Sequence, residues 1–216
     1  MPRWLTLAEA QARDLAGRWL ALALLFALPA GWYLAERAAG QPWAVGAGAL
    51  ATGWTSGAAA LFAVLGSRRI DPRLVQAGYR PRDLLLGRLA VLLGLALATA
   101  TAFTLLILVF SWPHNLLNVL LGLGLGAVVA VTLGWVVAVL VPHELEAVLI
   151  LIGIAGISPT APGPVGEWLP FYALLRFTDE TRPDPVAWPL VLHAIAYALV
   201  LGGAATLLWR RRVRLR

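Results

Sequence analysis

Residues 84–110 read LLLGRLAVLLGLALATATAFTLLILVF, an apolar run that contains a single charged residue, Arg88. A helix rises 1.5 Å per residue, so roughly 17–25 residues cross the hydrocarbon core of a bilayer, and this run is long enough to do so. Similar runs recur along the chain. The sequence therefore predicts an all-α membrane protein.

The composition of the whole chain supports the same class. It has 216 residues, of which 60% are hydrophobic and 13% are charged, and its mean hydropathy is +0.79. Soluble domains carry roughly 25% charged residues. The composition therefore excludes a soluble enzyme, a disordered chain and a free nucleic-acid binder. The absence of cysteine excludes disulfides and thiolate metal sites.

Six apolar spans are predicted, at residues 19–35, 43–66, 84–110, 116–141, 143–157 and 186–209, and the fifth is short. The first is interpreted as a retained helix, because its polar lead-in is too long for a signal peptide. All seventeen basic residues are arginines. If the N-terminus is cytosolic, only Arg37, Arg176 and Arg182 lie outside. This asymmetry predicts that both termini are cytosolic.

Residues 1–18 are predicted to form an amphipathic helix on the membrane surface, ahead of a transmembrane domain at 19–216. Thr6 and Glu9 have the spacing of a capping box. Four apolar side chains share one helical face: Trp4, Ala8, Leu15 and Trp19. An ordinary solvated leader is the alternative.

The loop at 67–83 is predicted to hold a short cytosolic helix. Asp71 suits the N-cap and Pro72 the first helical position. Gly78 can adopt the left-handed conformation that ends a helix, and Pro81 can begin the third span. A loop that merely joins two spans needs neither a glycine that ends a short helix nor a proline that begins the next one. A positively charged connecting loop with incidental turns is the alternative.

The segment at 159–185 contains six prolines around the stretch Glu167-Trp-Leu-Pro-Phe-Tyr-Ala-Leu-Leu-Arg-Phe177. Its aromatic residues favour a membrane interface. Because the span before it is short, the segment is predicted to be a re-entrant or interfacial helix on the outer face. A plain extracellular loop is equally compatible with the pattern.

Polar residues inside the spans are few. Asn118 and His193 are candidates for a translocation path or for hydrogen bonds between helices. Gly122 and Gly126, four residues apart, favour close helix packing, which would include a dimer interface.

An intramembrane serine protease of the rhomboid type is the competing enzyme class. Gly53-Trp-Thr-Ser-Gly57 and His193 resemble its Ser–His pair, with Ser56 as nucleophile. However, the first glycine stands three residues before Ser56 instead of two, and the serine lies two spans too early.

The layout as a whole resembles the membrane subunit of an ABC exporter of the type-two permease family. Residues 77–88 (AGYRPRDLLLGR) are similar to the turn before the family's third helix, and residues 169–176 (LPFYALLR) resemble the stretch before its last helix. The acidic residue and Gly-Thr that often precede the turn are replaced by Ser67-Arg-Arg-Ile70.

The resemblance implies a permease for a hydrophobic or amphipathic substrate in the plasma (inner) membrane of a prokaryote. It would form a homo- or heterodimer and dock a separate ATPase that binds ATP and Mg²⁺. The chain has no lysine and so no Walker motif of its own. The expected docking residues lie on the cytosolic loop: Asp71, Arg73, Gln76, Tyr79, Arg80 and Asp83. A non-transporting membrane scaffold or sensor subunit is a third class.

Overall fold

The structure, a computed structural model, describes residues 3–68, 70–161, 163–179 and 186–214. Within these ranges the chain is helical, without a strand, as the sequence predicts. The helices are α1 (Arg3–Ala16), α2 (Trp19–Ala38), α3 (Ala44–Ser67), α4 (Asp71–Gln76), α5 (Pro81–Phe110), α6 (Leu116–Leu140), α7 (Glu144–Ile157), α8 (Gly163–Glu167), α9 (Tyr172–Phe177) and α10 (Trp188–Arg214).

Five of the described helices are long and apolar enough to cross a membrane: α2, α3, α5, α6 and α10. They coincide with five of the six predicted spans. The remaining predicted span is α7, which has 14 residues and extends about 21 Å at 1.5 Å per residue. By length, α7 alone falls short of a full crossing.

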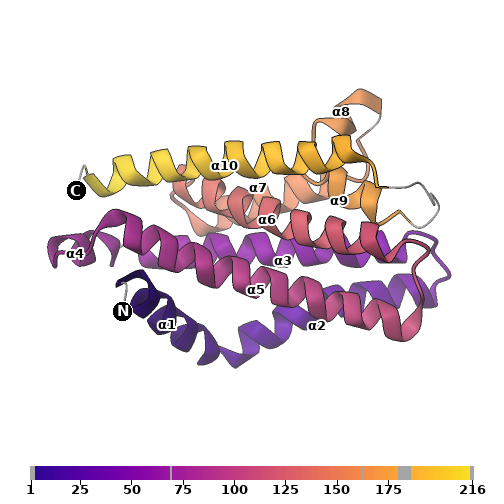
Figure 1. Cartoon of the computed structure of the whole chain (residues 1–216), viewed down its shortest axis with the longest axis horizontal. Coiled ribbons are helices and arrows are strands. Elements are labelled where there is room, and N and C mark those ends of the chain that lie inside the picture. Colours follow the sequence, from indigo (N-terminus) through magenta and orange to yellow (C-terminus); the bar gives the residue numbers. More distant parts are fainter. Residues whose placement is uncertain (1–2, 69, 162, 180–185, 215–216) are drawn as a thin grey trace.

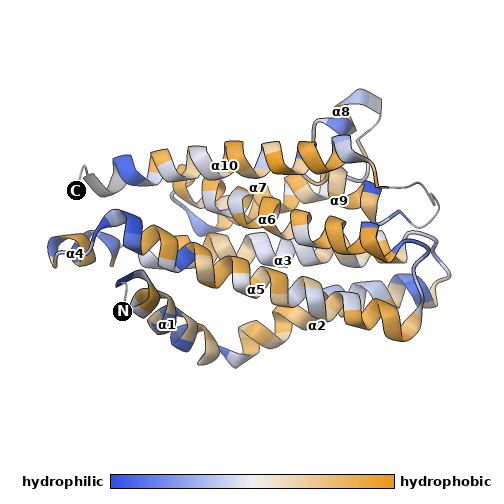
Figure 2. Cartoon of the chain, in the orientation of Figure 1, coloured by the Kyte–Doolittle hydropathy of each residue, from blue (hydrophilic) through white to orange (hydrophobic). Residues whose placement is uncertain are grey.

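The long helices lie side by side along the longest dimension of the molecule (Figure 1). Both chain ends lie at the same end of the bundle as α4, whereas α8 and α9 lie toward the other end. The helices are apolar through their middle sections and polar mainly near the two ends (Figure 2). We refer to the end that carries α4 and both termini as the base.

Helices α3 and α6 form the centre of the bundle. In the apolar windows of both helices 72% of the residues are buried, against 17% for α2 and α10 at the periphery. Gly134 of α6 lies directly against the backbone of Gly57 of α3, so no side chain separates the two helices there. Glycine permits such an approach because it has no Cβ atom.

Helix α1 begins earlier than the sequence predicts. It starts at Arg3, so Thr6 lies inside the helix and the predicted capping box is wrong; Glu9 instead forms an ion pair with Arg13 (2.6 Å). The partly covered face includes Trp4, Ala8 and Leu15, as predicted, and packs against α5 at Gly87. Trp19 does not share this face, because it begins α2 and is 72% exposed. The helix therefore lies against the base of the bundle.

Candidate functional site

Helix α4 is a short helix with a defined beginning and end, at the extreme base of the bundle (Figure 1). Pro72 lies in its first turn. At its end Gly78 has φ +90°, Gly78 N–H donates to Val75 O (3.0 Å) and Tyr79 N–H to Leu74 O (3.0 Å). This pair of bonds is the Schellman motif. Pro81 then begins α5, as the sequence predicts.

Asp71 is buried, although the sequence predicts it to be a docking residue on the surface. Its residue is 3% exposed, and its carboxylate does not cap α4, whose N-cap is Ile70. Instead, Oδ1 accepts a hydrogen bond from Arg88 Nη2 (2.7 Å) and Oδ2 accepts one from Arg88 Nη1 (3.0 Å). The indole Nε1–H of Trp209 also donates to Oδ2 (3.2 Å). The carboxylate therefore faces the interior of the bundle and cannot contact a docked protein.

The cluster around Asp71 joins five elements of the chain. Ser67 at the end of α3 lies 3.4 Å from Oδ2, and the Arg88 guanidinium of α5 lies 5.9 Å from the centroid of the Trp135 ring of α6. Trp209 brings in α10. A buried charge is tolerated when it is paired and hydrogen-bonded, and these contacts meet that requirement. We call Asp71, Arg88 and Trp209 the base joint.

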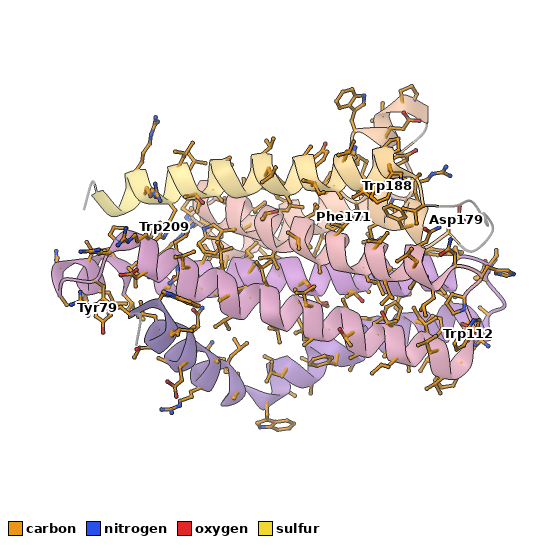
Figure 3. All side chains as sticks on the ribbon, in the orientation of Figure 1. Tyr79, Trp112, Phe171, Asp179, Trp188 and Trp209 are labelled. Atoms are coloured by element: carbon orange, nitrogen blue, oxygen red, sulfur yellow. The ribbon has the colours of Figure 1, made fainter. Side chains whose placement is uncertain are left out.

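The opposite face of α4 and the turn after it are open. Arg73, Gln76 and Arg80 are exposed, whereas Leu74 and Tyr79 pack partly against the core. Tyr79 and Trp209 lie at the same end of the molecule, opposite Trp112 and Asp179 (Figure 3).

Asp83 lies in the first turn of α5, with its side chain 14% exposed and 3.9 Å from the Arg82 guanidinium. Of the six predicted docking residues, then, Arg73, Gln76 and Arg80 are open, Tyr79 and Asp83 are partly covered, and Asp71 is buried.

Two further arginines fix the flanks of this loop. Arg3 Nη1 donates to Gly78 O (3.1 Å) beside a groove of about 320 Å³ that Thr6 and Tyr79 also line. The Arg68 guanidinium donates to Val141 O (2.6 Å), Pro142 O (2.8 Å) and Ala138 O, at the C-terminal end of α6. These carbonyls have no partner within the helix, so Arg68 acts as its cap.

Sequence reasoning left the roles of Arg88, Trp209 and Arg68 unassigned. The position of Arg88 does indicate an interaction partner, because a lone charge inside an apolar run needs one. No local pattern links it to Asp71, 17 residues away, or links Asp71 to Trp209, 138 residues away.

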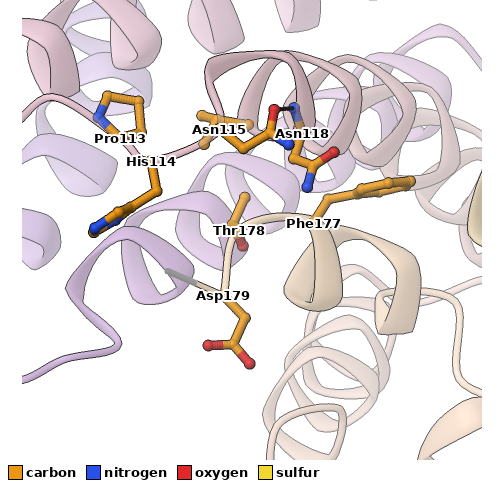
Figure 4. Close-up of a pocket in the computed structure, with 8 residues that line it drawn as sticks. Pro113, His114, Asn115, Asn118, Phe177, Thr178 and Asp179 are labelled. Carbon is orange, nitrogen blue, oxygen red and sulfur yellow. Dashed lines mark hydrogen bonds between the residues drawn. The ribbon is translucent and has the colours of Figure 1, made fainter. Parts of the chain in front are cut away.

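Asn118 lies at the other end of the bundle, in the first turn of α6. Its backbone N–H donates to Asn115 Oδ1 (3.2 Å), which caps the helix. It lines a small pocket with His114, Thr178 and Asp179 (Figure 4). Asn118 therefore lies near this end of the bundle and not in its middle.

His193 supports the irregular segment before α9. Its Nε2 lies 3.3 Å from Leu169 O, and its ring contacts those of Tyr172 and Tyr197. The Tyr197 hydroxyl donates to Trp168 O. Backbone at membrane depth needs such partners when it is not helical.

Ser56 and His193 do not form the pair that a serine protease requires. The Ser56 hydroxyl donates to Thr52 O (2.7 Å) within its own helix, and the residue is 2% exposed. His193 is engaged with Leu169 O. The structure therefore assigns separate local hydrogen bonds to the two residues.

Helix α9 packs inside the bundle and not above it. Phe171, just before α9, is buried against Gly53, nine residues into α3 and so about 14 Å from its first residue. Toward the other end of α9, Phe177 lies against Gly122. Close packing at Gly122 and Gly126 is thus confirmed, but their partner is α9 of the same chain.

Among the described residues, no group of three or more His, Cys, Asp and Glu side chains could hold a metal ion. Comparison with protein-family models gave no match, and no curated protein matches the chain.

Proposed function

We propose that this chain is the membrane permease subunit of an ABC exporter and that α4 docks a separate ATPase. A single observation carries the proposal: α4 is a short capped helix at the extreme base of the bundle, held by the base joint on one face and open on the other. A protein that docks there meets Arg73, Gln76 and Arg80, so its surface would be acidic.

The proposal includes six membrane crossings with both termini in the cytosol. Helix α6 ends at the base and α10 begins at the opposite end, so the chain between them returns through the bundle (Figure 1). Helix α7 covers the first part of this return, with Leu151 against Gly57 in the middle of α3. The path through α8 and α9 completes it as a re-entrant segment.

In the proposed mechanism the partner binds ATP and Mg²⁺ and closes around them. Closure pushes on α4. Since α4 is capped at Gly78 and fixed at Asp71, the push displaces the attached helices instead of deforming a loose loop. The apolar interior favours a hydrophobic or amphipathic cargo, and a second permease subunit would complete the path.

The test uses the chain reconstituted in liposomes with the ABC ATPase that co-purifies with it. Replacing residues 72–79 by a Gly/Ser linker should abolish ATPase binding and transport while the bundle stays folded. The double variant R73A/R80A should weaken ATPase binding at least tenfold, since interfacial charges contribute several kcal/mol. R13A/R18A removes the same charge from α1 and the turn that follows it, and should leave binding unchanged.

Two results would overturn the proposal. Full transport by the linker variant would show that α4 does not couple the ATPase to the permease. ATPase binding with neither cargo-stimulated hydrolysis nor transport would favour the scaffold or sensor class.

A further inference from the structure

The base joint connects the exposed loop directly to two of the helices that could span the membrane. Asp71 belongs to α4, Arg88 lies in the second turn of α5, and Trp209 lies near the end of α10. The side chains of Arg88 and Asp71 are 7% and 4% exposed, so water does not screen their attraction. Few other contacts attach α4 to α10.

From this geometry we infer that the base joint transmits displacement of α4 to α5 and α10, with Asp71, Arg88 and Trp209 as positioning residues. This inference rests on the proposed function in one respect, the identity of the partner that displaces α4. The attachment itself is a property of the chain alone.

Stability by itself does not account for the joint. Replacing a buried ion pair by apolar residues of similar volume is often neutral or stabilising, because the desolvation of both charges offsets their attraction. The ion pair instead fixes the orientation of the Asp71 carboxylate relative to the Arg88 guanidinium. Two parallel hydrogen bonds from a planar guanidinium fix the carboxylate in one orientation, and apolar packing would not.

The Trp209 hydrogen bond is the part of the joint that can be removed alone. W209F keeps an aromatic ring in the core, deletes the Nε1–H that reaches Asp71 Oδ2 and removes part of the buried indole volume. The Arg88–Asp71 pair then remains, so the variant should fold while α10 loses its link to α4. D71N removes the charge that both partners bind. W54F and D14N are the controls. Trp54 of α3 also packs against the core but does not contact Asp71, and Asp14 lies on exposed α1.

The experiment has two arms, and the first needs no ATPase. The chain lacks cysteine, so spin labels at Q76C and R210C report the α4–α10 distance without background. We expect a narrow distance distribution that broadens in W209F and D71N but not in W54F or D14N. In the second arm, transport per ATP hydrolysed should fall about tenfold in W209F, with ATPase binding unchanged. A tenfold change corresponds to the free energy of one hydrogen bond to a charged group.

The outcomes distinguish the role of the base joint from the proposed permease function. An unchanged distribution and unchanged transport per ATP in W209F and D71N would overturn the joint while leaving the permease proposal intact. A broadened distribution in a chain that binds no ATPase would support the joint and reject the permease. If D71N fails to fold, W209F alone decides, since it leaves the ion pair in place.

Discussion

Gly134 of α6 and Gly57 of α3 are in direct backbone contact, since an added Cβ on Gly134 would overlap the Gly57 carbonyl oxygen. Backbone cannot swing aside as a side chain can, so G134A must push α3 and α6 apart. We expect a loss of about 1–3 kcal/mol in the free energy of unfolding, the usual cost of overpacking a core. Denaturation in detergent, followed by fluorescence of the ten tryptophans, measures it.

G124A is the control for that measurement. Gly124 lies on the same helix and an added Cβ would meet no atom within 4 Å. Alanine favours the helix over glycine by up to about 1 kcal/mol, so the unfolding free energy of G124A should equal or exceed that of the wild type. Equal losses in the two variants would contradict the backbone contact.

The glycines that face α9 should differ in their tolerance of a methyl group. On Gly122 a Cβ would lie 2.7 Å from Phe177 Cβ, an atom fixed to the backbone of α9. On Gly126 it would lie 2.8 Å from Leu174 Cδ1, the movable end of a side chain. We therefore expect G122A to cost more unfolding free energy than G126A, by about 1 kcal/mol. The opposite order in the same denaturation assay would contradict the packing of α9 described above.

Local signals in the sequence were sufficient for most of the helices and for the C-terminal end of the short helix. Pro81 and Gly78 act through their own backbone preferences, so their effects were predictable from the residues alone. Thr6 was misplaced because α1 begins three residues before it, and Asp71 because its tertiary contacts outweigh capping. The Asp71 carboxylate binds Arg88 and Trp209, and neither partner is close in sequence.

The α6 cap provides a third prediction. R68A removes the donors to the partly buried carbonyls of Ala138 and Val141, and these acceptors then lose their partner. Leaving such groups unsatisfied costs about 1–3 kcal/mol, so R68A should lower the unfolding free energy by that amount. R73A, an exposed arginine on α4, should not change it. A similar fall in both variants would indicate a general effect of lost charge.

Membrane topology is testable with the cysteine-free chain. Single cysteines in place of Gln76 and Arg210 mark the base, and those in place of Trp112 and Thr160 mark the other end, all at exposed positions. In intact cells a membrane-impermeant maleimide should label only W112C and T160C, because the arginine-rich base is expected in the cytosol. Permeabilised cells should show labelling at all four. Labelling of Q76C in intact cells would reverse the topology and remove α4 from reach of a cytosolic ATPase.

Tyr197 should hold the irregular backbone before α9 in place, whereas the neighbouring Tyr172 hydroxyl has no hydrogen bond among the described residues. Y197F deletes the donor to Trp168 O and leaves the ring against His193. This exposed hydrogen bond contributes about 0.5–1.5 kcal/mol, so hydrogen exchange over residues 163–171 should accelerate by up to roughly tenfold when it is lost. Y172F removes a hydroxyl from the same aromatic group and should leave exchange unchanged. Equal protection in Y197F and the wild type would mean that the segment is held by the packing of Phe171 against Gly53 alone.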